Sequence, residues 1–264
     1  MVASADPGRG ARGLKRAWFE ESFGERYLRL YAHRDSEEAG RALDTLFPRH
    51  TLAGRTALDL ACGAGRYLRL LHERGAHATG VDLSAVLLQE ARLRFLSQGV
   101  AAPLVRADMR QLPFGHASFD VTLSMFTSFG YFQTKAEHAQ LALEMARVTS
   151  AIIVLDLPDH LSLAASLVPR SERRLEDRRV LEERHMEADP RRVVKRIAIC
   201  APGTDEVVER YEERVMLFER EEIAEMFEAA GFSIVDTLGD YSGAEWVAGQ
   251  SPRMILRLQR RKHA

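Results

Sequence analysis

One segment, residues 56–66 with the sequence Thr-Ala-Leu-Asp-Leu-Ala-Cys-Gly-Ala-Gly-Arg, constrains the fold more than any other part of the chain. Its first six residues are mostly apolar, which is typical of a buried parallel strand. Gly63 and Gly65 then interrupt the strand, and glycine permits positive φ and a close approach of a ligand to the main chain. The segment therefore predicts a strand that ends in a ligand-binding loop.

The residues after this loop extend the pattern. Leucines at helical spacing in residues 66–74 predict a helix that ends at Gly75, and residues 76–81 predict a second strand with Asp82 at its carboxyl end. Doubly wound α/β folds bind nucleosides at this succession of strand, glycine loop, helix, strand and acid. The simpler alternative is an ordinary βαβ unit with a tight turn.

The charge beside the loop indicates which nucleoside fits. A dinucleotide fingerprint requires a third glycine, but Leu68 occupies that position, and Asp59 lies just before the loop. A carboxylate repels a pyrophosphate by about 1 kcal/mol at a separation of about 4 Å in water, and by several times more where solvent is partly excluded. S-adenosylmethionine carries an ammonium and a sulfonium group and no phosphate, so an acid beside the loop attracts it.

At this point the chain resembles the class I S-adenosylmethionine-dependent methyltransferases. The resemblance rests on the order and spacing of four motifs and covers residues 56–156, with a looser match through the C-terminal segment. The motifs are residues 59–66 (Asp-Leu-Ala-Cys-Gly-Ala-Gly-Arg), 81–84 (Val-Asp-Leu-Ser), 107–109 (Ala-Asp-Met) and 119–121 (Phe-Asp-Val). The resemblance implies an α/β fold with a doubly wound, mostly parallel seven-stranded sheet, the Rossmann-like methyltransferase fold.

The same resemblance implies which residues contact the cofactor. It places the methionine end against Asp59, Gly63 and Gly65. It places the ribose hydroxyls on Asp82 and the adenine near Leu83, Asp108 and Met109, and Met125 completes the expected cofactor-binding set.

An aromatic N-terminal segment is expected to cover the cofactor. Residues 18–32 predict one helix with Phe19, Phe23, Tyr27 and Tyr31 on the same face. Aromatic residues at this spacing usually belong to a core. The functional alternative is a lid of the kind found in small-molecule methyltransferases that this chain looks like, with Tyr27 or Tyr31 facing the transferred methyl group.

A second aromatic segment, residues 126–132, follows the predicted strand 119–125. Its phenylalanines are interpreted as a small core beneath a loop, and Phe132 is assigned to that core. Sugar-amine N-methyltransferases, which are similar to the chain here, place a polar ring after the glycine that Gly130 matches. Tyr131 is therefore a candidate for contact with the acceptor.

Five regions are expected along the chain. They are a disordered N-terminus (1–16), lid helices (17–50), the S-adenosylmethionine-binding core (51–160), an inserted antiparallel β meander over the acceptor pocket (161–218) and the C-terminal part of the core (219–264). The meander is predicted from strand-like residues 180–187, 192–200 and 206–218, which Pro and Gly turns separate. The alternative is that the meander forms an oligomer interface, so a homodimer is also possible from the sequence.

Composition excludes several function classes. The 264 residues are 46% hydrophobic and 28% charged with a net charge of -1, so the chain can bury a core, and a nucleic acid is not expected as its main partner. Basic runs such as residues 170–179 are interpreted as solvated faces. The two cysteines, Cys62 and Cys200, form no metal or disulfide framework. Residues 1–16 lack the apolar middle of a secretory signal and no stretch approaches the length of a membrane span, so a cytoplasmic location without a membrane partner is predicted.

The predicted reaction is in-line displacement, which moves a methyl group from S-adenosylmethionine to an N or O atom of a small molecule. Alignment of the reactants supplies about 7–11 kcal/mol, whereas a general base adds about 10²–10⁴-fold, so a neutral amine acceptor needs no base. For a hydroxyl acceptor the candidate bases are, in falling order, His160, Asp156, His33 and Tyr131, and Tyr31 and Tyr131 are predicted to orient the acceptor. The alternatives are an RNA methyltransferase, an NAD-dependent oxidoreductase and a non-catalytic S-adenosylmethionine-binding protein.

Overall fold

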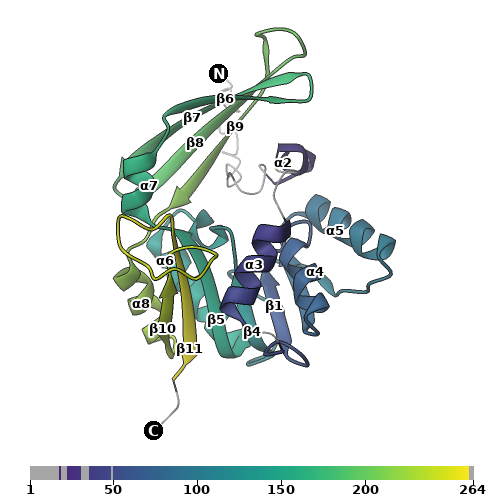
Figure 1. Cartoon of the computed structure of the whole chain (residues 1–264), viewed down its shortest axis with the longest axis vertical. Coiled ribbons are helices and arrows are strands. Elements are labelled where there is room, and N and C mark those ends of the chain that lie inside the picture. The colour runs from purple at the N-terminus through teal and green to yellow at the C-terminus, as the bar shows by residue number, and fades with distance from the viewer. Residues whose placement is uncertain (1–17, 19–22, 31–35, 49, 262–264) are drawn as a thin grey trace, which may run out of the picture.

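The computed structural model describes residues 18, 23–30, 36–48 and 50–261. Two sheets organise this part of the chain (Figure 1). The larger sheet has seven strands in the order β10-β11-β5-β4-β1-β2-β3, and the smaller has four in the order β6-β7-β8-β9. Figure 1 shows the smaller sheet standing above one end of the larger one, with the short helix α2 (Glu25–Leu30) close to it.

Five neighbouring strands of the larger sheet are parallel, as the succession of strands and helices predicts. They are β1 (Thr56–Leu60), β2 (His77–Asp82), β3 (Leu104–Arg106), β4 (Phe119–Ser124) and β5 (Thr149–Pro158). The sheet ends in the antiparallel pair β10 (Phe232–Leu238) and β11 (Arg253–Arg260). The doubly wound sheet of seven mostly parallel strands is thereby confirmed.

Helices cover both faces of this sheet, because successive strand side chains point to opposite faces. Ala57 of β1 belongs to the cluster under α3 (Ser36–Leu46), α4 (Arg66–Glu73) and α5 (Ala85–Ser97). Leu58, the next residue, belongs to the cluster under α6 (Lys135–Val148) and α8 (Arg220–Ala229). Polar caps fix the helix starts, including Ser84 at α5 and a capping box at Thr134 of α6.

The smaller sheet contains the predicted meander and one strand that the sequence did not predict. Its strands are β6 (Arg170–Leu175), β7 (Arg178–Ala188), β8 (Arg191–Cys200) and β9 (Val207–Met216), and all three pairings are antiparallel. The interpretation of residues 170–179 as only a solvated face was therefore incomplete, since most of them form β6. Ion pairs such as Arg173–Glu182 cross from this strand to its neighbour. α7 (His160–Ser166) connects β5 to the sheet.

The N-terminal segment corrects the prediction of one helix over residues 18–32. Trp18 is helical, but Phe23 and Gly24 form a bend, and helix α2 starts only at Glu25. Residues 1–17 and 31–35 lie outside the described part of the chain, and with them the predicted disordered start, Tyr31 and His33. Within the described residues, none of the helices combines the length and apolar character that crossing a membrane requires.

Candidate functional site

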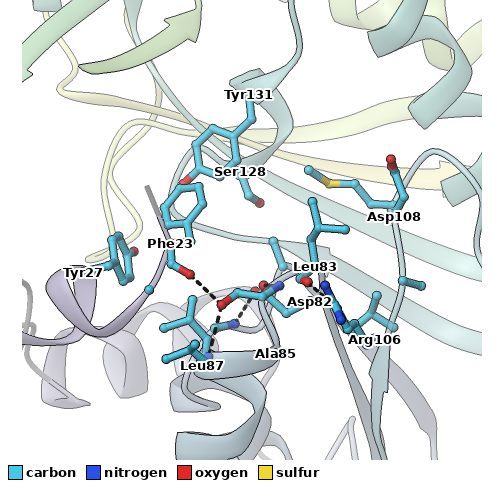
Figure 2. A pocket seen from close by; sticks show the side chains of 18 of the residues that line it. Phe23, Tyr27, Asp82, Leu83, Ala85, Leu87, Arg106, Asp108, Ser128 and Tyr131 are labelled. Atoms are coloured by element: carbon cyan, nitrogen blue, oxygen red, sulfur yellow. Dashed lines mark hydrogen bonds between the residues drawn. The ribbon is translucent and has the colours of Figure 1, made fainter. Parts of the chain in front are cut away.

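A cavity of about 580 Å³ opens at the carboxyl edge of the parallel strands (Figure 2). Ligand pockets of small molecules have this size, and this edge is where doubly wound folds bind ligands. Segments that follow β1, β2, β3 and β4 line it, together with Phe23 and Tyr27. A second cavity of about 140 Å³ adjoins the glycine loop. The two linings share Tyr27, Ala61, Gly63, Met125 and Phe126.

The loop after β1 is built by close backbone approach. Gly63 has φ +55° and lines both cavities, as predicted for a residue beside a ligand. Gly65 has a different role: its φ is +82°, and an added Cβ would lie 2.8 Å from the ring of Phe95 on α5. Gly65 is not among the described lining residues of either cavity, so it shapes the loop and the approach of α5.

Asp82 lies at the end of β2, as predicted, and lines the larger cavity. Its Oδ2 accepts a hydrogen bond from the Gly63 backbone N–H at 2.8 Å, and its Oδ1 accepts one from the Ser84 N–H at 2.8 Å. Burial raises the pKa of Asp82 although these backbone hydrogen bonds act in the opposite direction. The carboxylate thus ties the loop after β1 to the loop after β2, and its oxygens lie where ribose hydroxyls are expected.

Asp59 is the least satisfied acid of the site. It is 2% exposed, and its Oδ2 has no hydrogen-bond partner among the described atoms. Burial raises its pKa to about 7; a hydrogen bond from the Leu68 backbone opposes the rise, and the charge of Asp82 adds to it. The carboxyl lines the smaller cavity. A buried carboxylate oxygen without a donor is strongly unfavourable, and an ammonium group in that cavity would satisfy it.

Of the residues predicted to contact adenine, Asp108 lies at the end of the larger cavity away from Tyr27 (Figure 2). Leu83, Asp108 and Met109 all line it. The Arg106 side chain donates to the Leu83 carbonyl at 3.0 Å and so joins the ends of β2 and β3. Burial tends to raise the pKa of Asp108, but hydrogen bonds from Arg110 outweigh it, so the pKa lies below its usual value. This end therefore combines apolar side chains with an ionised acid.

Aromatic rings pack against Tyr131, which lies in the 3₁₀ helix η1 (Ser128–Tyr131) and lines the larger cavity. The Phe23 ring stacks on the Tyr131 ring at 5.1 Å, and Trp18 meets the same ring edge-on at 5.2 Å. Figure 2 shows Phe23 and Tyr131 side by side with Tyr27 beyond them. Behind η1, an added Cβ on Gly130 would lie 2.6 Å from the Met216 carbonyl oxygen of β9. The smaller sheet therefore packs directly against the segment that presents Tyr131.

Two predicted bases lie away from the cavities. His160 begins α7, is half-buried and is absent from the described linings of both cavities. Asp156 is fully buried in β5. It forms an ion pair with Arg253 at 2.5 Å and accepts hydrogen bonds from the Tyr241 hydroxyl at 2.6 Å and the Phe126 N–H at 2.8 Å. Asp156 is thus a structural acid, and the Tyr241 hydroxyl supports it.

Sequence reasoning missed Phe126 and Ser128 as cavity residues. Phe126 lines both cavities, and its backbone, with that of Thr127, has positive φ (58° and 71°). Non-glycine residues rarely adopt this conformation, and no residue type in this segment signals it. The Phe126 N–H bond to Asp156 and a 2.9 Å bond from the Thr127 N–H to the Asp156 carbonyl hold it. Phe129 and Phe132 belong to the main core rather than to a separate small core beneath a loop, and Phe132 also lines the larger cavity.

Comparison with known proteins agrees with this geometry. Residues 57–151 match the family described as a methyltransferase domain. Over 221 residues the chain is 29% identical to the dTDP-3-amino-3,6-dideoxy-alpha-D-glucopyranose N,N-dimethyltransferase of Streptomyces fradiae, a match that covers 80% of this chain and 81% of that enzyme.

Solved structures extend the similarity to the whole fold. The sugar N-methyltransferase KedS8 from Streptoalloteichus sp ATCC 53650 superposes with a TM-score of 0.68 at 24% identity and covers 99% of both chains. CalS10, an amino pentose methyltransferase from Micromonospora echinaspora solved with S-adenosylmethionine bound, superposes with a TM-score of 0.64 at 22% identity, over 90% of this chain and 97% of that one.

Proposed function

Since the chain is a class I S-adenosylmethionine-dependent methyltransferase, we propose that it methylates the amino group of a small sugar-like acceptor. The observation that carries the cofactor assignment is the buried, unpaired Oδ2 of Asp59 in the smaller cavity, which shares Gly63 with the larger cavity that Asp82 lines. Support for the acceptor comes from relatives that act on amino sugars and match across 80% or more of this chain.

The binding roles follow from the positions of the side chains. Asp59 and Gly63 would hold the methionine end, Asp82 the ribose hydroxyls, and Leu83 with Met109 the adenine. When bound, S-adenosylmethionine supplies an electrophilic methyl group on a sulfonium. Phe126 and Met125 line both cavities, at the junction between the methionine end and the acceptor space.

The acceptor would lie between η1 and the N-terminal segment. Tyr131 and Phe23 orient it and exclude water, and the smaller sheet, packed against Gly130 through Met216, supports η1 from behind. An amine brings its own lone pair, so the enzyme needs to align the reactants rather than to provide a base. Alignment lowers the activation barrier by about 7–11 kcal/mol. The proton of the methylated amine leaves to solvent after transfer. Tyr31 and His160 stay predictions for the catalytic set.

The test is a panel of acceptors offered with S-adenosylmethionine. Amino sugars, either free or linked to a nucleoside diphosphate, are compared with phenols and with unmodified RNA. The mass gain of one methyl group is measured for each acceptor. We expect transfer to amino sugars only, lost in Asp82→Ala and reduced in Tyr131→Phe. Transfer to phenols would move the assignment to an O-methyltransferase, and normal turnover by Tyr131→Phe would remove Tyr131 from the acceptor site.

A further inference from the structure

The hydroxyl of Ser84 makes two hydrogen bonds at once. It accepts the Leu87 N–H at 3.2 Å, which caps α5, and it donates to the Phe23 carbonyl at 2.5 Å; these are the dashed lines that start at Leu87 and Phe23 in Figure 2. Capping uses only a lone pair of the oxygen, so the proton is available for the second bond. Ser84 therefore joins two segments that lie 61 residues apart in the sequence.

The same residue also contacts the acid of the cofactor site. Its backbone N–H donates to Asp82 Oδ1 at 2.8 Å. The path from the ribose-binding carboxylate to the Phe23 carbonyl thus passes through one residue, by its N–H on one side and its hydroxyl on the other. Any shift of Asp82 on cofactor binding would move Ser84 with it.

Phe23 transmits this attachment to the acceptor side of the cavity. Its ring stacks on Tyr131 at 5.1 Å and meets Tyr27 edge-on at 4.8 Å. Further along the same segment, Leu30 packs against Val180 and other apolar residues of the smaller sheet. Residues 23–30, which we call the lid segment, therefore lie between the cofactor loops and the smaller sheet, and Ser84 attaches their N-terminal end.

We propose that Ser84 is a positioning residue that fastens the lid segment over the bound cofactor. The Ser84–Phe23 hydrogen bond holds the Phe23 ring against Tyr131, so it slows cofactor release and shapes the acceptor space. The inference rests on the proposed function, because it concerns the lid of that cofactor site.

Three variants separate this role from helix capping. Ser84→Thr keeps both the cap and the donated bond. Ser84→Gly removes the donated bond, but glycine is tolerated at an N-cap nearly as well as serine; Ser84→Ala removes the bond and is a poor cap. All three keep the backbone N–H to Asp82. Each is checked by thermal unfolding, and each is loaded with S-adenosylhomocysteine.

Hydrogen–deuterium exchange of the amides of residues 23–30 and the dissociation rate of S-adenosylhomocysteine are then measured. We expect Ser84→Gly and Ser84→Ala to lose lid protection equally and to release the ligand between about 2-fold and about 12-fold faster, the range for one net hydrogen bond. Ser84→Thr should match the wild type. In turnover, KM for the acceptor should rise in the glycine variant.

Two results overturn the proposal. If Ser84→Gly retains wild-type protection while Ser84→Ala does not, Ser84 is only a helix cap. If all variants release the ligand at the wild-type rate, the Ser84–Phe23 hydrogen bond does not affect cofactor release. Should the wild-type protein fail to bind S-adenosylhomocysteine at all, the proposed function falls together with this inference, and that outcome is distinct from the other two.

Discussion

Replacing Asp59 by asparagine should stabilise the cofactor-free protein and weaken its binding of cofactor. Asp59 is 2% exposed, and burial raises its pKa from 3.8 to about 7. A shift of about 3 pKa units corresponds to about 4 kcal/mol. This acid binds its proton more tightly in the folded than in the unfolded state, so its contribution to stability is lost as pH rises from 3.8 to about 7. Asparagine does not titrate and avoids that loss.

Cofactor binding should show the opposite dependence on pH. An ammonium group beside Asp59 favours the ionised acid. With a pKa of about 7, the ionised fraction in the free protein rises from about 10% at pH 6 to about 90% at pH 8. If only the ionised form binds well, affinity for S-adenosylmethionine should tighten about tenfold across this range. Binding at pH 7 should release about half a proton.

Two measurements test this reasoning. Calorimetric titration at pH 6, 7 and 8, in buffers of different ionisation enthalpy, gives the affinity and the number of protons released. Urea unfolding without cofactor at pH 5 and pH 8 gives the stability of the wild type and of Asp59→Asn. Asp177→Asn, in the exposed turn between β6 and β7, is the control.

We expect Asp59→Asn to gain stability at pH 8, to gain less than half as much at pH 5, and to bind cofactor weakly without dependence on pH. If the affinity of the wild type does not change between pH 6 and 8, Asp59 is not half-ionised near pH 7 in the free protein. An Asn variant that binds as tightly as the wild type would refute its contact with the cofactor.

Three further substitutions test the surroundings of the site. Gly65→Ala should lower the free energy of unfolding in urea by about 2–5 kcal/mol, because the cost of a positive φ and the cost of the 2.8 Å approach to Phe95 add. Gly203→Ala is the control: Gly203 also has positive φ but open space around it, so the loss should be about 1–2 kcal/mol. Burial lowers the pKa of His138 to about 4, so stability is lost as pH falls from 6.5 towards 4; His138→Phe should flatten that decline in urea unfolding measured from pH 7 to 4. Asp156→Ala should cost about 3–5 kcal/mol at pH 7 in the same measurement, because the half-buried Arg253 is left without its counter-charge.

The core of the fold could be predicted because its signals are local. The parallel strands are short apolar runs, the glycines and acids follow them directly, and Ser84 caps α5 as its residue type suggests. Since the carboxyl ends of parallel strands meet at one edge, strand order alone places Asp82, Asp108 and Met125 around one cavity. Order and spacing, together with the family resemblance, were therefore enough to predict that these three residues lie at one cavity.

The smaller sheet and the lid segment could not be predicted as well, because long-range contacts decide them. β6 has the sequence Arg-Ser-Glu-Arg-Arg-Leu, which lacks apolar alternation; cross-strand ion pairs to Glu182 and Glu183 accompany its pairing instead. The bend at Phe23 interrupts an aromatic period that predicts a continuous helix, and the partner of its carbonyl, Ser84, lies 61 residues away. Neither feature has a signal within a short window of sequence.

The structure also changes the reason why the loop selects a cation. From the sequence alone, Asp59 is expected to be ionised and to repel a pyrophosphate. With a pKa of about 7, Asp59 can keep its proton beside an anion, and the repulsion then largely disappears. A cation instead expels the proton and gains the full attraction of a buried carboxylate. Selectivity for a sulfonium cofactor over a dinucleotide therefore arises mainly from what the cation gains, and it should be greater at pH 8 than at pH 6.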